Sequence, residues 1–294
     1  MSGLISTTGL SKRYGSQWAL RELNLEVQSG EVLGYLGPNG AGKTTTIRLL
    51  LGLISPTSGS ATIFGLDVRG HAPDVHRHLA YVPGEANLWP ALTGHQTLTL
   101  LGRTHGSVDA AYRDLLIERF DFDPGKNVRS YSKGNRQKLS LIAALMTRAE
   151  LLILDEPTSG LDPLMEQRFR ESIAEAKQNG QTVFLSSHIL SEVEALCDRV
   201  AILRAGELLE IGTLDEMRHL AAVKVEATFD GPPPDVSNVP GVSAPEVDGN
   251  RLTCHITGSI QPLLAVIAQS GVRELLSSEP SLEELFLSHY GAGA

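Results

Sequence analysis

Near the start of the chain stands the stretch Gly37-Pro38-Asn39-Gly40-Ala41-Gly42-Lys43-Thr44, which fits the pattern G-x-x-x-x-G-K-[ST]. The apolar run at 32–36 before it is typical of a strand, and residues 45–51 after it can continue as a helix. Strand, glycine loop and helix in this order are the context that a phosphate-binding loop requires. The alternative is a chance glycine turn before a helix, and the flanking strand and helix count against it.

This loop has the chemistry to hold a nucleotide and its metal ion. Glycines let the backbone curl so that successive N–H groups point at a phosphate, and the new helix adds its positive N-terminal end. Lys43 is expected to reach the β- and γ-phosphates, and Thr44 to offer its hydroxyl to Mg2+. The predicted nucleotide-binding residues of the loop are Gly37, Pro38, Asn39, Gly40, Ala41, Gly42, Lys43, Thr44 and Thr45.

Composition places the chain among globular proteins and argues against nucleic acid as a partner. The 294 residues exceed what one hydrophobic core usually organises, which favours two domains. The net charge is -9, and no basic stripe stands out in the sequence. The two cysteines, Cys197 and Cys254, form no metal-ligand pattern and suit a reducing cytoplasm. We expect no signal peptide and no membrane span, so another polypeptide would have to supply any membrane contact.

A pair of acids follows a second apolar run, Leu151-Leu152-Ile153-Leu154. Such a run predicts a central parallel strand that is buried on both faces. Asp155 then lies where open α/β sheets bind ligands and is expected to hold Mg2+. Glu156 could polarise an attacking water. The alternative is that both acids are solvated residues of a turn. It is less favoured because two adjacent carboxylates after a buried strand are costly in free energy without a cation.

Two further residues have both a structural and a functional interpretation. His188 follows a buried strand at 182–187, where a lone histidine is more often structural. Beside a triphosphate, however, a histidine can donate a hydrogen bond to the γ-phosphate. Tyr14 lies in a polar turn, where it could stack on a flat base, although packing is the commoner role of such an aromatic residue.

The sequence predicts an α/β domain with insertions, followed by a small C-terminal α+β domain. Strands at 4–10 and 20–28 precede the phosphate loop, and the character is helical from about 92 to 146. A change of composition after Ala222 marks a second region with strands at 224–229 and 251–256. Helices are expected there at about 260–270 and 281–290. The predicted domains are 1–220, with a helical subdomain over about 90–147, and 221–294.

Together these residues resemble the ATP-binding subunits of ABC transporters. Gly37–Thr44 matches the family's Walker A loop, and Leu151–Glu156 its Walker B strand. Ser132-Lys133-Gly134-Asn135 is similar to the signature sequence, and Ser159–Asp162 to the D-loop. The resemblance covers residues 1 to about 220, with the motifs in the family's order.

The resemblance implies a fold and a division of roles. The fold is a P-loop NTPase core, with a mainly parallel sheet and an antiparallel β-subdomain, a helical insertion subdomain and a small C-terminal α+β domain. Lys43, Glu156 and His188 are the implied catalytic residues, and Tyr14 would stack on adenine. Thr44 and Asp155 are the implied metal ligands. A second subunit would contribute its signature residues to the site in trans, namely Ser132, Gly134 and Asn135.

The sequence departs from the family pattern at two motifs. The signature is usually L-S-G-G-Q, whereas here it is Tyr131-Ser132-Lys133-Gly134-Asn135. The glutamine expected after Tyr81-Val82-Pro83 is absent, and Gly84-Glu85 stands in its place. Glu85 is therefore a further candidate ligand for Mg2+. A carboxylate cannot donate a hydrogen bond as glutamine does, so hydrolysis could be slower or coupled differently.

The expected function is that of an ATPase subunit of an export system. Residues 278–287 resemble the ending of ATPase subunits of ABC-2-type drug and antibiotic exporters. The expected partners are an integral membrane permease on a separate chain and a second ATPase subunit. The expected location is cytoplasmic, at the inner face of the cell membrane, with ATP and Mg2+ as cofactors. The alternatives are an importer ATPase subunit and a soluble ABC-type regulatory ATPase.

Overall fold

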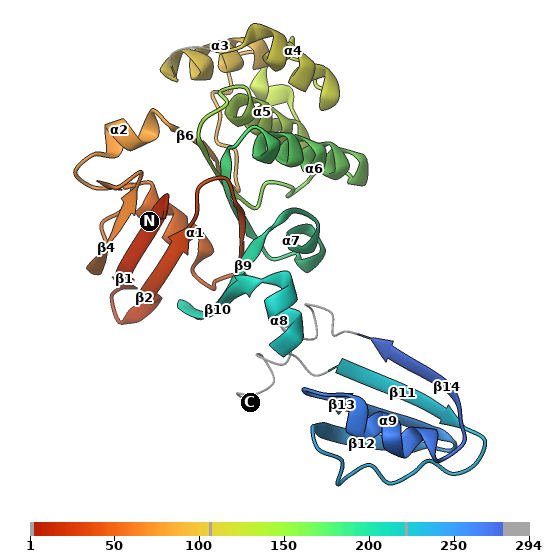
Figure 1. Cartoon of the computed structure of the whole chain (residues 1–294). Helices are drawn as coiled ribbons and strands as arrows, with labels where there is room; N and C mark the ends of the chain where they lie inside the picture. Colours follow the sequence, from red (N-terminus) through yellow and green to blue (C-terminus); the bar gives the residue numbers. More distant parts are fainter. Residues whose placement is uncertain (1–2, 106–107, 221–222, 279–294) are drawn as a thin grey trace. The chain divides into compact units, whose positions relative to one another are not determined.

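The computed structural model describes residues 3–105, 108–220 and 223–278, which form two compact units (Figure 1). The first unit is Met1–Ile211 and the second is Gly212–Ala294. The sequence predicts a division between residues 220 and 221. The structure groups the short helix α8 (Leu214–Leu220) with the second unit.

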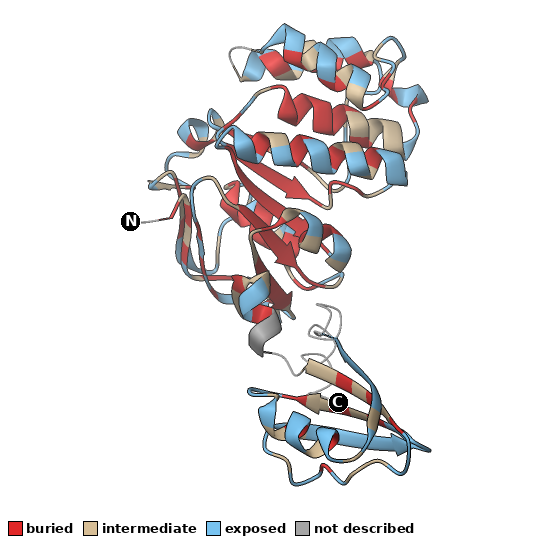
Figure 2. Cartoon of the chain, turned by 45° about the vertical axis from the view of Figure 1, so that its right-hand side comes forward, coloured by how far each residue is buried: buried red, intermediate tan, exposed pale blue. Residues whose placement is uncertain are grey.

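A six-stranded sheet forms the middle of the first unit, in the order β10-β9-β3-β8-β7-β6. Its strands are β3 (Val32–Leu36), β6 (Leu79–Val82), β7 (Leu151–Asp155), β8 (Thr182–Ser187), β9 (Arg199–Arg204) and β10 (Glu207–Thr213). The pairings from β9 through β3, β8 and β7 to β6 are all parallel. Every residue of β3, β7 and β8 is buried, as Figure 2 shows in red, which explains why these strands are continuous apolar runs.

Three helices flank this sheet: α1 (Lys43–Leu50), α6 (Pro163–Gln178) and α7 (Leu190–Leu196). The helix α6 connects β7 to β8 and α7 connects β8 to β9, whereas α1 directly follows β3. The helix α7 packs closely against β3 because Gly34 has no side chain. A Cβ atom on Gly34 would lie 2.7 Å from Val193 Cγ1. Because β3, β8 and β7 are parallel, their carboxyl ends meet at one edge, where the phosphate loop, Ser187 and Asp155 follow one another across the sheet.

The antiparallel β-subdomain expected from the sequence is a four-stranded sheet in the order β2-β1-β4-β5. Its strands are β1 (Ile5–Tyr14), β2 (Gln17–Val27), β4 (Ser58–Ile63) and β5 (Leu66–Asp67). Leu23 and Ile63 from this sheet share one hydrophobic cluster with Ile47 of α1 and Phe184 of β8. The cluster joins the two sheets, and the predicted P-loop NTPase architecture is confirmed.

The helical region lies between β6 and β7, as the sequence predicts. It contains α3 (Gly94–Thr104), α4 (Ala110–Arg119), a 3-10 turn (Val128–Ser130) and α5 (Lys133–Leu145), and the short α2 (Ala72–His76) precedes β6. Polar side chains cap the longer helices. Thr93 and Gln96 form a capping box at α3, Asp109 caps α4 and Ser132 caps α5. The sequence prediction missed α2.

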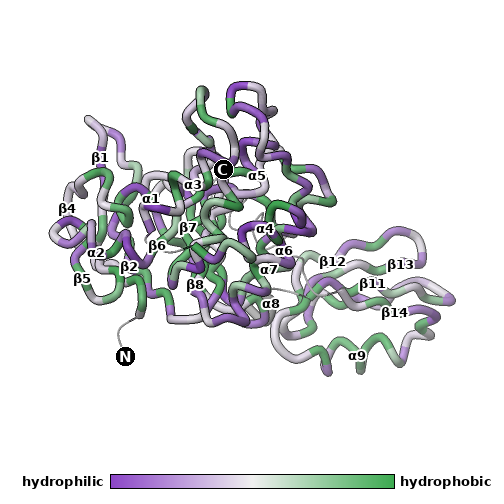
Figure 3. Tube along the Cα trace, turned by 90° about the horizontal axis from the view of Figure 1, so that it is seen from above, coloured by the Kyte–Doolittle hydropathy of each residue, from purple (hydrophilic) through white to green (hydrophobic). Residues whose placement is uncertain are grey.

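The second unit contains a four-stranded antiparallel sheet in the order β12-β13-β11-β14. Besides α8 it comprises β11 (Val223–Phe229), β12 (Val242–Asp248), β13 (Arg251–Ile256), α9 (Gln261–Ala268) and β14 (Val272–Ser278). Leu263 and Ile267 of α9, which Figure 3 colours largely as hydrophobic, share a core with Phe229 and Cys254. The helix predicted at 281–290 and the tail motif beyond Ser278 lie outside the described residues. Among the helices that are described, none is long and apolar enough to cross a membrane.

Candidate nucleotide site

The phosphate loop joins β3 to α1 and depends on its glycines. Gly42 has a φ of 111°, in the left-handed region, and a Cβ atom there would lie 2.4 Å from the Ala19 carbonyl oxygen. A Cβ atom on Gly37 would lie 2.5 Å from the Leu203 carbonyl oxygen. The loop is thus closely packed between β2 and β9, and a larger residue at either glycine would displace it.

Lys43 folds back onto this loop. Its ammonium donates to the carbonyl oxygens of Gly37, at 2.6 Å, and Pro38, at 3.2 Å. The same nitrogen lies 3.3 Å from Glu156 Oε1. The side chain is buried, so the ammonium is held between the loop backbone and the carboxylate that follows β7.

Thr44 and Asp155 bring a hydroxyl and a carboxylate together at the N-terminus of α1. The Thr44 hydroxyl donates to Asp155 Oδ2 at 2.9 Å, and the Ser186 hydroxyl donates to Asp155 Oδ1 at 2.5 Å. A hydroxyl and a carboxylate are hard oxygen ligands, which Mg2+ prefers, and Mg2+ keeps several waters or phosphate oxygens besides. The pair therefore fits Mg2+. No group of three or more His, Cys, Asp or Glu in the described part of the chain is arranged to hold a metal on its own.

Glu156 lies at the centre of the candidate site. Its φ is 47°, a left-handed conformation that is strained for a residue with a side chain. The Glu156 amide donates to the Ser186 carbonyl oxygen at 3.1 Å, which fixes the peptide against β8. Its Oε1 atom contacts Lys43 and also lies 3.2 Å from His188 Nδ1. Two of the predicted catalytic residues, Lys43 and His188, thus contact the same carboxylate oxygen of the third.

A cavity of about 500 Å³ adjoins these groups. Its lining combines the phosphate loop, the end of β7, the segment after β6 and the start of α5. The lining residues are Asn39, Thr44, Arg48, Tyr81, Pro83, Gly84, Glu85, Asn87, Lys133, Asp155, Glu156 and Ser159. Burial, together with the Asp155 carboxylate, raises the pKa of Tyr81 to about 12, so this phenol stays protonated at neutral pH.

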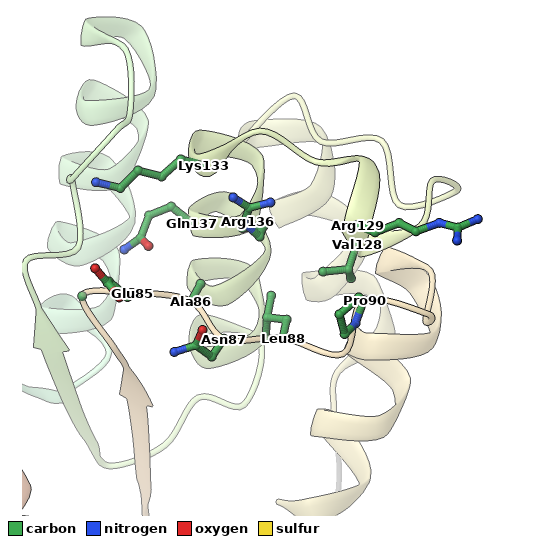
Figure 4. A pocket seen from close by; sticks show the side chains of 11 residues that line it. Glu85, Ala86, Asn87, Leu88, Pro90, Val128, Arg129, Lys133, Arg136 and Gln137 are labelled. Carbon is green, nitrogen blue, oxygen red and sulfur yellow. The ribbon is translucent and has the colours of Figure 1, made fainter.

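Glu85 shares this cavity with the predicted metal ligands. It also lines a second cavity of about 430 Å³ between the 84–90 segment and α5, where Lys133 and Gln137 lie (Figure 4). Glu85 is not part of a metal-ligating cluster with Asp155 and Glu156 in the described structure. Its role as a ligand stays a prediction.

The remaining predicted residues lie outside the larger cavity. Tyr14 is 49% exposed at the end of β1, and Lys12 Nζ lies 5.1 Å from its ring centroid. Ser132 Oγ accepts a hydrogen bond from the Asn135 amide, so Ser132 caps α5. Neither Gly134 nor the other two signature residues line this cavity. Their roles in trans stay predictions.

Sequence reasoning missed the residues that support the two acids. Ser186 is paired in register with Asp155 across β7 and β8, and it touches both Asp155 and Glu156. Its signal was a serine at the end of an otherwise apolar strand. Lys133 was noted only as a departure from the family's signature, yet its ammonium donates to Ser159 Oγ at 2.9 Å.

Comparison with known proteins gives matches over the whole chain. Residues 20–159 match the family described as ABC transporter. The chain is 36% identical to the bacitracin transport ATP-binding protein BcrA of Bacillus licheniformis, with 100% of this chain and 99% of that protein covered. It is 37% identical to the daunorubicin resistance ATP-binding protein DrrA3 of Streptomyces coeruleorubidus, with 96% and 94% covered.

Solved structures with the same fold include an ATP-binding subunit of an ABC transporter. That structure has a TM-score of 0.68 and 33% sequence identity, and covers 73% of this chain and 92% of its own. The dimeric cassette MJ0796 has a TM-score of 0.65 at 22% identity, with 71% and 98% covered, and is similar in fold.

Proposed function

Because this chain belongs to the ABC transporter family, we propose that it is the ATPase subunit of a system that exports drugs, antibiotics or other amphipathic compounds. The names of the bacitracin and daunorubicin relatives support export, since both match over nearly their full length. The observation that carries the chemistry is the contact of Glu156 with both Lys43 and His188, beside the Thr44–Asp155 pair.

The arrangement suits transfer of a γ-phosphoryl group to water. Lys43 and the loop amides bind the phosphates, and His188 donates a hydrogen bond to the γ-phosphate. The Glu156 carboxylate orients the attacking water and accepts its proton. Mg2+, held by Thr44 and Asp155, would neutralise charge on the phosphate oxygens. The chain's own contribution is therefore positioning and charge stabilisation, which are the main requirements of phosphoryl transfer.

We further propose that the site is completed by a second copy of the chain. Ser132 and Gly134 lie at the N-terminus of α5, where a hydroxyl and a close-approaching backbone amide can contact the γ-phosphate of the other copy. Asn135 would take part from the same turn. ATP then joins the two copies, and hydrolysis releases them because the shared contacts are lost.

The proposed partner in the membrane is a permease on a separate chain, which places this subunit at the cytoplasmic face of the cell membrane. Support comes from the transport and resistance roles in the relatives' names. Co-purification of the tagged chain with a membrane protein, followed by stimulation of its ATPase activity with candidate drugs, tests this proposal. Recovery of the chain without any membrane protein would count against it.

The central test of the mechanism is the substitution Glu156→Gln. The amide keeps the shape of the side chain but cannot accept a proton as a carboxylate does. We expect ATP binding to be retained, single-turnover hydrolysis to fall by about a hundredfold or more, and an ATP-bound dimer to accumulate. Nucleotide titration, rapid quench and size-exclusion chromatography provide the three measurements. Unchanged single-turnover hydrolysis would refute the role of Glu156.

A further inference from the structure

Gln137 is a buried polar residue on α5 that contacts the segment directly after Glu156. Only 2% of its surface is exposed. Its side-chain amide donates to the Pro157 carbonyl oxygen at 2.9 Å. A buried amide with a backbone partner is an ordered contact, because breaking it would leave the carbonyl without a donor in a low-dielectric interior.

The same face of α5 touches this segment at two more points. The Lys133 ammonium donates to Ser159 Oγ, and a Cβ atom on Gly134 would lie 2.6 Å from the Gly160 carbonyl oxygen. Residues 133 and 137 are one helical turn apart and point to the same side of α5 in Figure 4. The start of α5 and the segment 157–160 are therefore packed as one unit.

Contacts on both sides hold the Glu156 peptide in its strained conformation. Before it, the Glu156 amide is bonded to the Ser186 carbonyl of β8. After it, the Pro157 carbonyl is bonded to Gln137 of α5. A left-handed φ at a residue with a side chain persists only when its surroundings determine it. The Ser159 amide also donates to the Glu156 carbonyl oxygen at 3.1 Å, and Gln137 is the support that comes from the helical region.

We propose that Gln137 is a positioning residue that sets where the Glu156 carboxylate lies and carries movements of α5 to it. The inference rests on the proposed role of Glu156 as the base. Since α5 begins with the signature residues, a contact made there by a second copy would move Gln137 and hence the base. The Gln137 side chain is bonded to Pro157 and does not line the cavity beside Thr44 and Asp155, so it acts on turnover and leaves nucleotide binding unchanged.

Gln181 provides a matched control within the same fold. It is also buried, with 7% of its surface exposed, and its side-chain amide donates to the Ala149 carbonyl oxygen at 2.6 Å. Ala149 precedes β7, whereas Pro157 follows it, so the same kind of bond occurs at opposite ends of one strand. The two bonded carbonyl groups therefore differ in their distance along the chain from Glu156, because Pro157 directly follows Glu156 and Ala149 lies before the strand.

The experiment compares Gln137→Met and Gln181→Met in the full chain. We expect similar falls in Tm for both variants, because each loses one buried hydrogen bond. Only Gln137→Met should lower kcat, by about ten- to a hundredfold, while its KM for ATP stays within about twofold. Equal kcat in the two variants, or a rise in KM for Gln137→Met in place of a fall in kcat, would overturn the proposal.

A second variant, Gln137→Glu, separates positioning from folding. The introduced carboxyl can donate to the Pro157 carbonyl only when it is protonated. Its kcat relative to wild type should therefore rise as the pH is lowered from about 8 to about 6, and a flat ratio would contradict the inference. Glu156→Gln is measured in parallel. If Glu156→Gln loses turnover while Gln137→Met behaves as Gln181→Met does, the role of Glu156 as the base is supported and only the positioning role of Gln137 is refuted.

Discussion

Glu192 is a buried carboxyl group on α7, beside the site but outside the proposed mechanism. Its surface is 8% exposed, and the Ser187 hydroxyl donates to its Oε2 atom. Its Oε1 atom is the one buried side-chain oxygen or nitrogen without a hydrogen-bond partner among the residues the structure describes. Burial raises the pKa of this carboxyl, and the Glu166 carboxylate adds to the rise. The hydroxyls of Ser187 and Thr158 and the nearby His188 lower it by less.

This shift makes stability depend on pH. Above the ordinary pKa of 4.5 the folded chain still holds the proton that the unfolded chain releases. The folded state thus binds more protons, so its stability falls as the pH rises through the raised pKa. The Glu192→Gln side chain cannot titrate, so we expect this variant to show a smaller fall in Tm as the pH rises above the ordinary pKa of 4.5. The same change at the exposed Glu118 of α4 is the control. If the Tm of Glu192→Gln fell with pH as steeply as that of the wild type, the proposed contribution of Glu192 to the pH dependence would be wrong.

At the scale of single residues, the sequence predicts groups that stand at fixed positions in a motif. Lys43, Thr44, Asp155 and Glu156 are found together because the loop and β7 place them by local geometry. Ser186 was missed because its contact with Asp155 depends on the register of two strands that are far apart in the sequence. Periodicity gives a strand but does not give the register of its neighbours.

At the scale of elements, Ser132 has two roles that can be separated. It caps α5 through the Asn135 amide and is also the proposed contact to the γ-phosphate of a second copy. Ser132→Ala should lower the free energy of unfolding by about 1 kcal/mol through the lost cap. It should also reduce ATP-dependent dimerisation, since the hydroxyl is lost from the other copy's site.

Thr93→Ala is the matched control for this prediction. Thr93 caps α3 through the Gln96 amide, so its loss should cost a similar free energy of unfolding. Dimerisation in ATP should stay as in the wild type, because α3 carries no signature residue. Chemical denaturation and light scattering with ATP provide the two measurements. A dimerisation defect of the same size in both variants would assign Ser132 to capping alone.

Elements with a strong pattern were predicted well, and short ones were not. The buried strands β7 and β8 contain continuous apolar runs, so their existence and type follow from the sequence. The helix α2 has only five residues and begins beside a proline, and such a short segment with a proline is typical of a turn. Strand β12 has mostly exposed residues, so no apolar alternation marks it.

At the scale of the whole molecule, a shared site predicts complementation between two inactive variants. Lys43→Ala removes the lysine from both sites of a dimer, and Ser132→Ala removes the serine from both. In a mixed dimer, one site combines the intact Lys43 of one copy with the intact Ser132 of the other. An equal mixture should therefore recover ATPase activity, approaching about a quarter of the wild-type rate if the copies pair at random and the sites act independently.

Separate tags on the two variants allow the mixed dimers to be isolated before the assay. The mixture of Lys43→Ala with Glu156→Gln is the control. Both residues belong to the same copy's half of the site, so each mixed site keeps one defect and no activity should return. Recovery in the control, or none in the first mixture, would contradict a site shared between copies.

The Lys43 side chain bends back onto the phosphate loop, and this contact has a thermodynamic consequence for nucleotide binding. Its ammonium already has the carbonyl oxygens of Gly37 and Pro38 and the carboxylate of Glu156 as partners. A phosphate that takes this ammonium exchanges one set of contacts for another, and the loop loses little conformational entropy in the exchange because it is already ordered. The enthalpy of binding is then the difference between the two sets. The affinity for nucleotide therefore depends on how much more strongly the Lys43 ammonium interacts with a phosphate than with the oxygen atoms of the protein.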